Sequence, residues 1–330
     1  MVKLTNTNLK VLFLKKYNYC TLFDSNYLTR GLAMYESLKK NSDDFHLYIF
    51  PFDDRSLNLL KKLDLESVTI ISLKEFEDND LLKVKNDRTK TEYCWTCTPS
   101  IIKYCIEKYQ LYNCTYLDAD LYFFSKPSVL IEEMGNKSVL ITEHRYTKEY
   151  DQSATSGIYC VQFMTFINDA NSMKVLDLWR NACNKWCYAR FENGKFGDQK
   201  YLDNWTKQFV GIHELKHLGG GVAPWNIQQY KLEKKPFELI FYHFHSFKYL
   251  PNDKVDLGNY KLRKTDLLML YKPYLLHLEK IKIEILNVDD SYDYHGTSKL
   301  ETDWKKPLRN LNRRIKQCYN IYNINYILGL

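Results

Sequence analysis

Tyr116-Leu117-Asp118-Ala119-Asp120 is the stretch that most strongly indicates the fold of this 330-residue chain. It predicts a hydrophobic strand that ends in two carboxylates, and the next run, Leu121-Tyr122-Phe123-Phe124, is apolar again. Two aspartates at the end of a buried strand are costly unless a positive charge lies between them. Carboxylate oxygens suit hard cations such as Mg²⁺ or Mn²⁺. We therefore expect Asp118 and Asp120 to hold a divalent metal that neutralises a nucleotide diphosphate.

Strand and helix patterns alternate upstream of this stretch. Apolar runs predict strands within 11–24, at 45–50 and at 68–71, and apolar side chains near a 3.6-residue period predict helices at 28–40 and 57–63. The resulting β-α-β-α-β order implies a parallel sheet covered by helices. Such sheets collect their ligands at the carboxyl ends of the strands, where Asp118 is expected to lie.

The remaining patterns divide the chain into two parts. Further strands are predicted at 139–142, 157–163 and 237–244, and helices at 173–188 and 264–281. The pattern changes after Pro251, with no linker rich in glycine or serine. We expect one catalytic domain over residues 1–250, followed by an extension over residues 251–330.

Composition favours a globular chain over a disordered one. Hydrophobic residues make up 45% of it and the net charge is +7. No apolar run approaches the roughly 18–20 residues of a membrane span, and the first residues lack a signal-peptide core, so a cytoplasmic location is expected. Nine cysteines are then expected to be reduced thiols; the alternative of a zinc site at Cys94, Cys97, Cys183 and Cys187 has little support from its apolar surroundings.

The last 28 residues carry most of the excess charge. Six lysines and arginines against Asp303 give residues 303–330 a charge of +5. Leu308, Leu311 and Ile315 recur near helical spacing, which predicts a basic amphipathic helix. Such a helix suits the surface of an anionic membrane, here its inner face. The alternative is a helix packed on the catalytic domain with a solvated basic face.

A second group of candidate ligands follows the late strand. His243 and His245 are expected on one face of it, and either could complete a metal site with the two aspartates. Lys248 could neutralise a leaving diphosphate. The structural alternative is a pair of core histidines.

Two further segments suggest ligand contacts. Asp198-Gln199, after a glycine, could hold sugar hydroxyls or flank a reacting carbon, although Asp198 would also make a good helix cap. The glycines at 219–221 permit close backbone approach to a ligand, and their spacing excludes a P-loop and a dinucleotide-binding fingerprint.

Taken together, these motifs resemble the metal-dependent glycosyltransferases of the GT-A fold over about residues 17–250. The likeness is strongest to retaining enzymes of the glycogenin and lipopolysaccharide-galactosyltransferase type and to related bacterial glycosyltransferases. It implies an α/β fold, a Rossmann-like mixed sheet flanked by helices, with the basic helical extension added. It also implies transfer of a hexose from a nucleotide diphosphate sugar, a UDP-sugar above all, to a glycan or lipid-linked acceptor with retention.

The resemblance also assigns roles. Asp24, Asn26 and Tyr27 match the motif that holds base and ribose; Asp118 and Asp120 match the metal motif. Asp198 and Gln199 match the pair that contacts the donor sugar, His243 the metal-binding histidine, and Lys248 the diphosphate lysine. The segment from His217 to Trp225 also reproduces the family's late motif, with Ala223 in place of its lysine, so His217 stays a third candidate ligand after His243 and His245. The arginine that the family carries before the metal motif has no counterpart; Thr96, Thr98 or Ser100 could replace it.

Two other classes are weaker alternatives. A sugar nucleotidyltransferase could use the same paired aspartates, but residues 21–31 lack its glycine-rich basic loop. A nucleic-acid-binding module would need a broad basic field, whereas the charge outside the last 28 residues is only +2, from +7 minus +5. We therefore expect no nucleic-acid partner.

Overall fold

The computed structural model describes residues 17–292, 295–298 and 306–330. Within them the centre is a seven-stranded mixed sheet in the order β3-β2-β1-β4-β7-β6-β8. Parallel pairing joins β1 to β2 and β4, β2 to β3, and β6 to β8, while β7 runs antiparallel to β4 and β6. The strands are β1 (Tyr17–Phe23), β2 (Phe45–Pro51), β3 (Val68–Ile70), β4 (Asn113–Leu117), β6 (Val139–Glu143), β7 (Tyr159–Ile167) and β8 (Ile212–Glu214).

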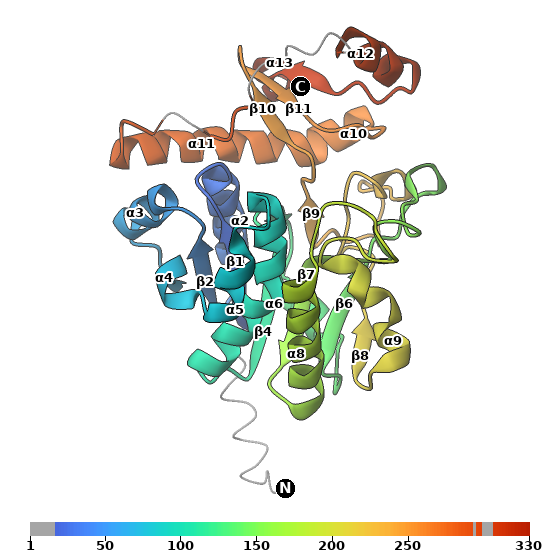
Figure 1. Cartoon of the computed structure of the whole chain (residues 1–330). Coiled ribbons are helices and arrows are strands. Elements are labelled where there is room, and N and C mark those ends of the chain that lie inside the picture. Colours follow the sequence, from blue (N-terminus) through green and yellow to red (C-terminus); the bar gives the residue numbers. More distant parts are fainter. Residues whose placement is uncertain (1–16, 293–294, 299–305) are drawn as a thin grey trace, which may run out of the picture.

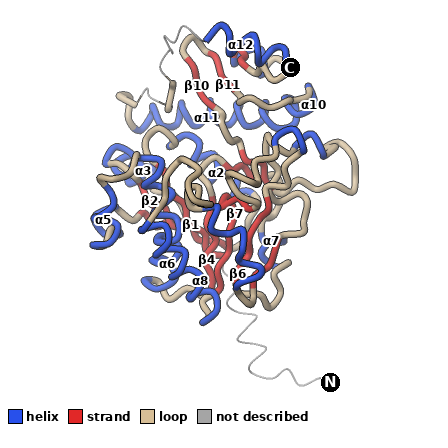
Figure 2. The backbone as a smooth tube through the Cα atoms, turned by 45° about the vertical axis from the view of Figure 1, so that its right-hand side comes forward, coloured by secondary structure: helices blue, strands red, loops and turns tan. Residues whose placement is uncertain are grey.

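Helices cover both faces of this sheet, as Figure 2 shows. Alternate residues of β1 point to opposite faces. Tyr19 and Phe23 join a core cluster with α2 (Leu28–Lys40) and α3 (Asp54–Leu63), whereas Cys20 and Leu22 pack with α6 (Lys90–Lys108) and α8 (Ala170–Lys185). The shorter helices are α4 (Leu73–Phe76), α5 (Asn79–Lys85), α7 (Ser128–Glu132) and α9 (Trp205–Gln208).

A second, two-stranded sheet positions the late strand. It pairs β5 (Leu121–Phe123) antiparallel with β9 (Phe241–His243). The predicted strand at 237–244 is thus much shorter than expected. Its first residues lie in a loop, where Ile240 still donates its N–H to the carbonyl oxygen of Gly219 (3.0 Å).

The extension after residue 250 contains strands as well as the predicted helices. A three-stranded antiparallel sheet is made of β10 (Lys248–Leu250), β11 (Lys254–Asp256) and β12 (Ile321–Asn323). The helices are α10 (Lys264–Asp266), α11 (Lys272–Val288), which a π-helical turn precedes, α12 (Lys306–Ile315) and α13 (Ile324–Leu328). Figure 1 shows α11 lying across the top of the large sheet, with this small sheet and α12 beyond it.

The extension shares a core with the preceding part of the chain. Leu275, Leu278 and Ile281 of α11 belong to the same buried cluster as Leu32 of α2. His277 of α11 also hydrogen-bonds Glu36 of α2 (2.7 Å). Residues 11–16 of the predicted first strand, and Asp303, Trp304 and Lys305 of the basic segment, lie outside the described residues. None of the helices that the described residues form has both the length and the hydropathy to cross a bilayer.

Candidate metal and nucleotide site

The two aspartates lie where β4 ends and the chain turns into β5. The Asp118 N–H donates to the carbonyl oxygen of Gln162 (3.0 Å), and the Leu121 N–H donates to that of Asp118 (3.2 Å). The Tyr116 hydroxyl donates to Asp118 Oδ1 (2.9 Å). The carboxylates are therefore held at the end of a strand of the large sheet, as the sequence predicts.

Pairing of β5 with β9 brings His243 to the aspartates, although they are more than 120 residues apart. Leu121 and His243 are partners in this ladder, and the Phe244 N–H donates to the carbonyl oxygen of Asp120 (2.9 Å). His243 Nε2 then lies 3.1 Å from Asp120 Oδ1 and 3.7 Å from Asp118 Oδ2. One ligand atom from each residue falls within 4.8 Å of the others.

The orientation of His243 suits a metal ligand. Its Nδ1 lies 2.7 Å from Gln162 Oε1, which can only accept, so Nδ1 carries a proton and Nε2 faces the carboxylates. A ligating histidine is normally fixed by such an outer hydrogen bond. Neighbouring ligands of an octahedral ion with bonds of about 2.1 Å lie about 3.0 Å apart, close to the separations seen here. The three residues therefore fit Mg²⁺ or Mn²⁺.

The charges of this cluster are unbalanced without a cation. Burial raises the pKa of Asp118 to about 6, and the charge of Asp120 adds to the effect. Although burial opposes it, Asp120 holds the pKa of His243 well above its usual range. The Asp118 side chain keeps 29% of its surface exposed, so an ion can reach the cluster from solvent.

Asp198 joins the cluster from the loop before a short 3₁₀ helix at Gln199–Asn204. Burial, followed by the charge of Asp118, raises the pKa of Asp198 to about 8. Asp198 occupies the N-cap position of this helix, as the alternative expected, but its side chain makes no capping hydrogen bond. Gln199 donates Nε2 to the carbonyl oxygen of Ser156 (2.7 Å), which leaves its own Oε1 as an acceptor.

Asp24, Asn26 and Tyr27 form a tight turn between β1 and α2. Asp24 Oδ1 accepts from the N–H groups of Asn26 (2.9 Å) and Tyr27 (3.2 Å), and Oδ2 lies 2.6 Å from Lys90 Nζ. Arg30, one turn later, is buried and stacks on the Tyr27 ring, with its guanidinium carbon 4.6 Å from the centroid. Arg30 also contributes to holding the pKa of Asp120 low, after His243. Sequence reasoning missed Arg30, although its place on α2, three residues after Tyr27, was visible.

The other candidate ligands lie outside the three-residue cluster. His245 is exposed in the turn after β9, with its ring centroid 5.6 Å from that of His243. The expectation that the two histidines share a strand face is wrong, because β9 ends at His243. His217 accepts from the Gly219 N–H through Nδ1 (3.1 Å). Lys248 is exposed at the start of β10.

The three glycines approach protein atoms of their own chain. A Cβ on Gly219 would lie 1.8 Å from the carbonyl oxygen of Glu238, and one on Gly221 would lie 2.6 Å from Thr142 Cγ2. The segment runs beside β9, where the His243 N–H donates to the carbonyl oxygen of Val222 (2.9 Å). These glycines thus permit packing that holds the histidine strand, which explains them without a ligand.

A segment of the extension covers the Asp24–Tyr27 turn, which the sequence did not indicate. The Tyr292 hydroxyl donates to the carbonyl oxygen of Ser25, and His295 Nδ1 lies 2.8 Å from Thr29 Oγ1. A Cβ on Gly296 would lie 2.3 Å from the Asn26 carbonyl oxygen. The conformation of the turn is therefore tied to the C-terminal extension.

The cysteines considered for zinc do not form a ligand cluster among the described residues. Cys94 and Cys97 lie on α6, and Cys183 on α8 with Cys187 just beyond it. A different group, Cys20, Cys105 and Cys114, brings its sulfur atoms within 4.8 Å of one another, fully buried in the core cluster around α6. Hydrophobic packing accounts for these three thiols.

No family model matches the chain. It is 31% identical over 280 residues to the uncharacterized protein YfnD of Bacillus subtilis, which covers 80% of this chain and 89% of YfnD. It is 26% identical over 291 residues to the uncharacterized protein YfnF of the same organism, covering 83% of this chain and 96% of YfnF.

Among solved structures, the chain is similar to the galactosyltransferase LgtC in complex with donor and acceptor sugar analogues. The TM-score is 0.50 and the identity 10%, and the match covers 80% of this chain and 95% of LgtC. It is also similar to the glycosyltransferase GlyE of Streptococcus pneumoniae, with a TM-score of 0.51, 14% identity, and coverage of 83% of this chain and 62% of GlyE. These likenesses confirm the predicted GT-A fold.

Proposed function

The chain belongs to the same family as YfnD of Bacillus subtilis, and we propose that it is a metal-dependent glycosyltransferase. The proposed reaction moves a hexose from a nucleotide diphosphate sugar, a UDP-sugar, to a hydroxyl of a glycan or lipid-linked acceptor. The observation that supports it most directly is the cluster of Asp118, Asp120 and His243 at the carboxyl end of β4, in a chain with the GT-A fold. In this proposal residues 1–250 form the catalytic part.

The proposed cation, Mn²⁺ or Mg²⁺, would be held by Asp118, Asp120 and His243. When bound, such an ion stabilises negative charge on diphosphate oxygens. Gln162 keeps the Nε2 atom of His243 directed at the carboxylates. Arg30 adds a buried positive charge beside the site.

The remaining residues are proposed to bind the donor. Asp24, Asn26 and Tyr27 would hold base and ribose, because their turn lies beside the aspartates: the charges of Asp120, Asp24 and Asp118 all act on the Tyr27 hydroxyl. Asp198 would accept hydrogen bonds from sugar hydroxyls, and Gln199 would face the anomeric carbon through its Oε1 atom. Retention of configuration belongs to this proposal. It is supported by the resemblance of Asp198-Gln199 to the corresponding pair of retaining enzymes.

Contact with an anionic membrane surface is proposed for α12. The helix has no buried residue, and Leu308, Leu311 and Ile315 expose 60%, 55% and 72% of their surface. Arg309 and Arg314 flank this apolar stripe on the same helix. Basic amphipathic helices of this kind lie in the interface of anionic bilayers.

The function is tested with a panel of sugar nucleotides and Mn²⁺, scoring slow donor hydrolysis without acceptor. We expect one donor to release nucleoside diphosphate, and Asp120→Asn to lower this rate at least about a hundredfold, as loss of charge stabilisation at a reacting centre does. The matched control is Asp177→Asn, an exposed aspartate on α8. Full metal-dependent turnover by the Asp120→Asn protein would rule out the proposed site. Release of a sugar 1-phosphate with pyrophosphate would instead identify a nucleotidyltransferase.

A further inference from the structure

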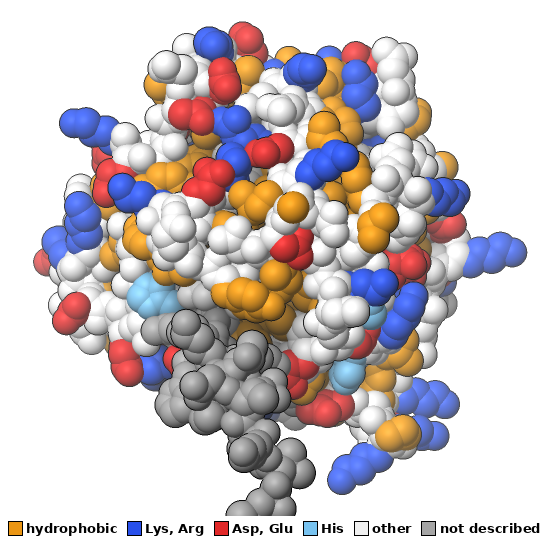
Figure 3. All heavy atoms as spheres, turned by 90° about the horizontal axis from the view of Figure 1, so that it is seen from below, with side chains coloured by type: hydrophobic (Ala, Val, Ile, Leu, Met, Phe, Trp, Pro, Cys, Tyr) orange, Lys and Arg blue, Asp and Glu red, His pale blue; other side chains and the backbone are white. Residues whose placement is uncertain are grey.

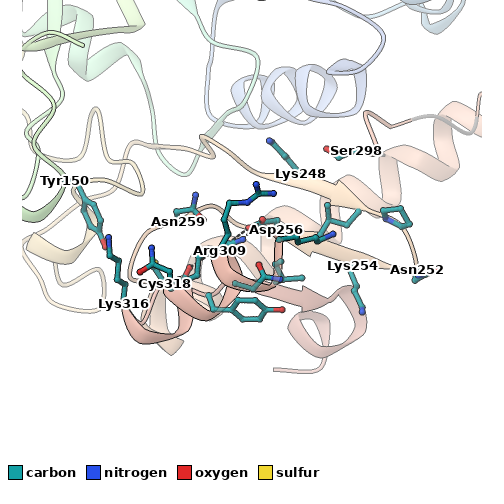
Figure 4. Close-up of a pocket in the computed structure, with 18 of the residues that line it drawn as sticks. Tyr150, Lys248, Asn252, Lys254, Asp256, Asn259, Ser298, Arg309, Lys316 and Cys318 are labelled. Carbon is teal, nitrogen blue, oxygen red and sulfur yellow. Dashed lines mark hydrogen bonds and ion pairs between the residues drawn. The ribbon is translucent and has the colours of Figure 1, made fainter. Parts of the chain in front are cut away.

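A cavity lies mostly in the extension, and none of its lining residues belongs to the aspartate cluster. It has a volume of about 860 Å³ and lies between the β10-β11 strands and α12. Six basic and two acidic side chains line it. Figure 4 shows the labelled residues around it, with Lys316 beside Tyr150 at one end and Asn252 at the other. Its volume falls within the range of small-ligand sites, about 300–1,000 Å³.

Both acidic side chains at the cavity are already paired. Asp256 receives both terminal nitrogens of Arg313, at 2.8 Å and 2.6 Å. Glu149 lies 3.0 Å from Lys261 Nζ, which is not a lining residue. The positive charge of the remaining lysines is therefore not neutralised by these carboxylates.

Four lining lysines lack an ion-pair partner within the described part of the chain. No carboxylate oxygen there lies within 4.0 Å of Nζ in Lys248, Lys254, Lys306 or Lys316. Like charges gathered around one cavity repel one another unless an anion joins them. Figure 3 shows the opposite end of the molecule, where both basic and acidic side chains lie on the surface.

The cavity is connected to the candidate site through one short stretch of chain. Lys248 lines the cavity and follows His243, the last residue of β9, by five positions. Leu308 and Leu311 of α12, the helix that lines part of the cavity, are exposed. An apolar chain that extends from the cavity can thus lie against these exposed leucines.

We propose that this cavity binds the phosphate groups of the acceptor, a phosphate or diphosphate ester of an apolar chain. Lysine ammonium groups bind phosphate as point charges. This inference rests on the proposed function, because it names the class of its acceptor. It differs from general membrane contact in requiring a phosphate ester inside the cavity.

The test uses farnesyl diphosphate as the probe, with farnesol as the uncharged comparison. Binding is measured by calorimetry on the full chain in a chelating buffer, so that no metal at the aspartates competes for the diphosphate. The variant Lys254→Gln/Lys306→Gln/Lys316→Gln removes three lining charges. The matched control, Lys174→Gln/Lys185→Gln/Lys207→Gln, removes three exposed charges from α8 and α9.

We expect farnesyl diphosphate to bind at least tenfold more weakly to the cavity variant and unchanged to the control, and farnesol to bind neither. Equal binding by wild type and cavity variant, or no binding by wild type, would overturn the inference. So would farnesol binding as tightly as the diphosphate, or displacement of the probe by a single-stranded oligonucleotide at lower concentration.

Donor hydrolysis separates this inference from the proposed function. The cavity variant is expected to hydrolyse the sugar nucleotide at the wild-type rate, because none of its three lysines belongs to the donor site. Absence of hydrolysis in the wild type would refute the proposed activity while the metal-free binding result still stood. Loss of probe selectivity with normal hydrolysis would refute only the acceptor site.

Discussion

Replacing Gln162 by leucine tests whether the orientation of His243 is what makes the aspartate cluster a metal site. Gln162 is fully buried, and its side chain meets His243 Nδ1 through one hydrogen bond of 2.7 Å. Leucine has a similar volume and no acceptor, so Nδ1–H loses its partner. The backbone contact with Asp118 uses the Gln162 carbonyl oxygen and is unaffected.

The expected magnitude follows from that single bond. A buried donor left without a partner costs about 1–3 kcal/mol. At about 1.4 kcal/mol per tenfold, this corresponds to a loss of roughly 5- to 150-fold in Mn²⁺ affinity. Loss of an outer hydrogen bond to a metal-bound histidine typically costs about 10- to 100-fold, in agreement.

The assay is titration of the purified protein with Mn²⁺, followed by calorimetry or by the electron paramagnetic resonance signal of the free ion. Gln162→Glu keeps an acceptor for Nδ1–H, and its Mn²⁺ affinity should equal or exceed that of the wild type. The control is Thr165→Val, a change on the same strand as Gln162. It removes a buried hydrogen bond of 2.8 Å to Thr115 of β4 but does not touch the histidine. Wild-type Mn²⁺ affinity in folded Gln162→Leu protein would refute the reasoning.

Three other predictions concern the surroundings of the site. Tyr292→Phe removes the hydrogen bond to the Ser25 carbonyl oxygen. Because such a bond contributes about 0.5–1.5 kcal/mol, the KM for the donor should rise about two- to tenfold. The kcat of steady-state donor hydrolysis should stay unchanged. Gly219→Ala forces a Cβ onto a backbone oxygen 1.8 Å away and should destabilise the protein by about 1–3 kcal/mol or more in urea unfolding. Gly194→Ala has open space around the new Cβ and meets only the strain of its φ of +74°, so it should lose less stability. Hydrogen bonding to His277 lowers the pKa of Glu36 in the folded protein. The carboxylate therefore stabilises the fold fully above its unfolded pKa of about 4.3, and this stabilisation is lost as the pH falls through the lower pKa of the folded state. Glu36→Gln should therefore unfold at lower urea than wild type at pH 7, and the difference should vanish near pH 3; a difference that is the same at both pH values would contradict this.

Local patterns predicted the strands of the large sheet except β8, and also its first helices. The helix expected at 28–40 is α2, with the same limits. The strand expected at 45–50 extends by one residue, to Pro51. Helix α6 begins at Lys90, because Thr89 and Glu92 form a capping box, and an apolar pattern does not reveal this start.

Prediction was weaker where a residue's environment depends on distant chain. The late strand was expected over eight residues and spans three, because its length is set by pairing with β5, itself three residues long. The glycines near 219 were interpreted as room for a ligand, but the oxygen that a Cβ would meet belongs to Glu238. Strands β11 and β12 of the extension were missed, since two runs of three residues carry little periodicity.

The sequence by itself determined the identity of the carboxylates at the end of β4 and the α/β order that places them at the ligand edge of a sheet. Both follow from local spacing, because strand alternation and helical period are properties of neighbouring residues. Only the tertiary structure decided that His243, and neither His245 nor His217, completes the cluster within 4.8 Å. It likewise brought Arg30 beside Asp120, and Tyr292 onto the turn at Asp24–Tyr27. These relations depend on pairing and packing between segments far apart in the chain, which leave no periodic signal in the sequence.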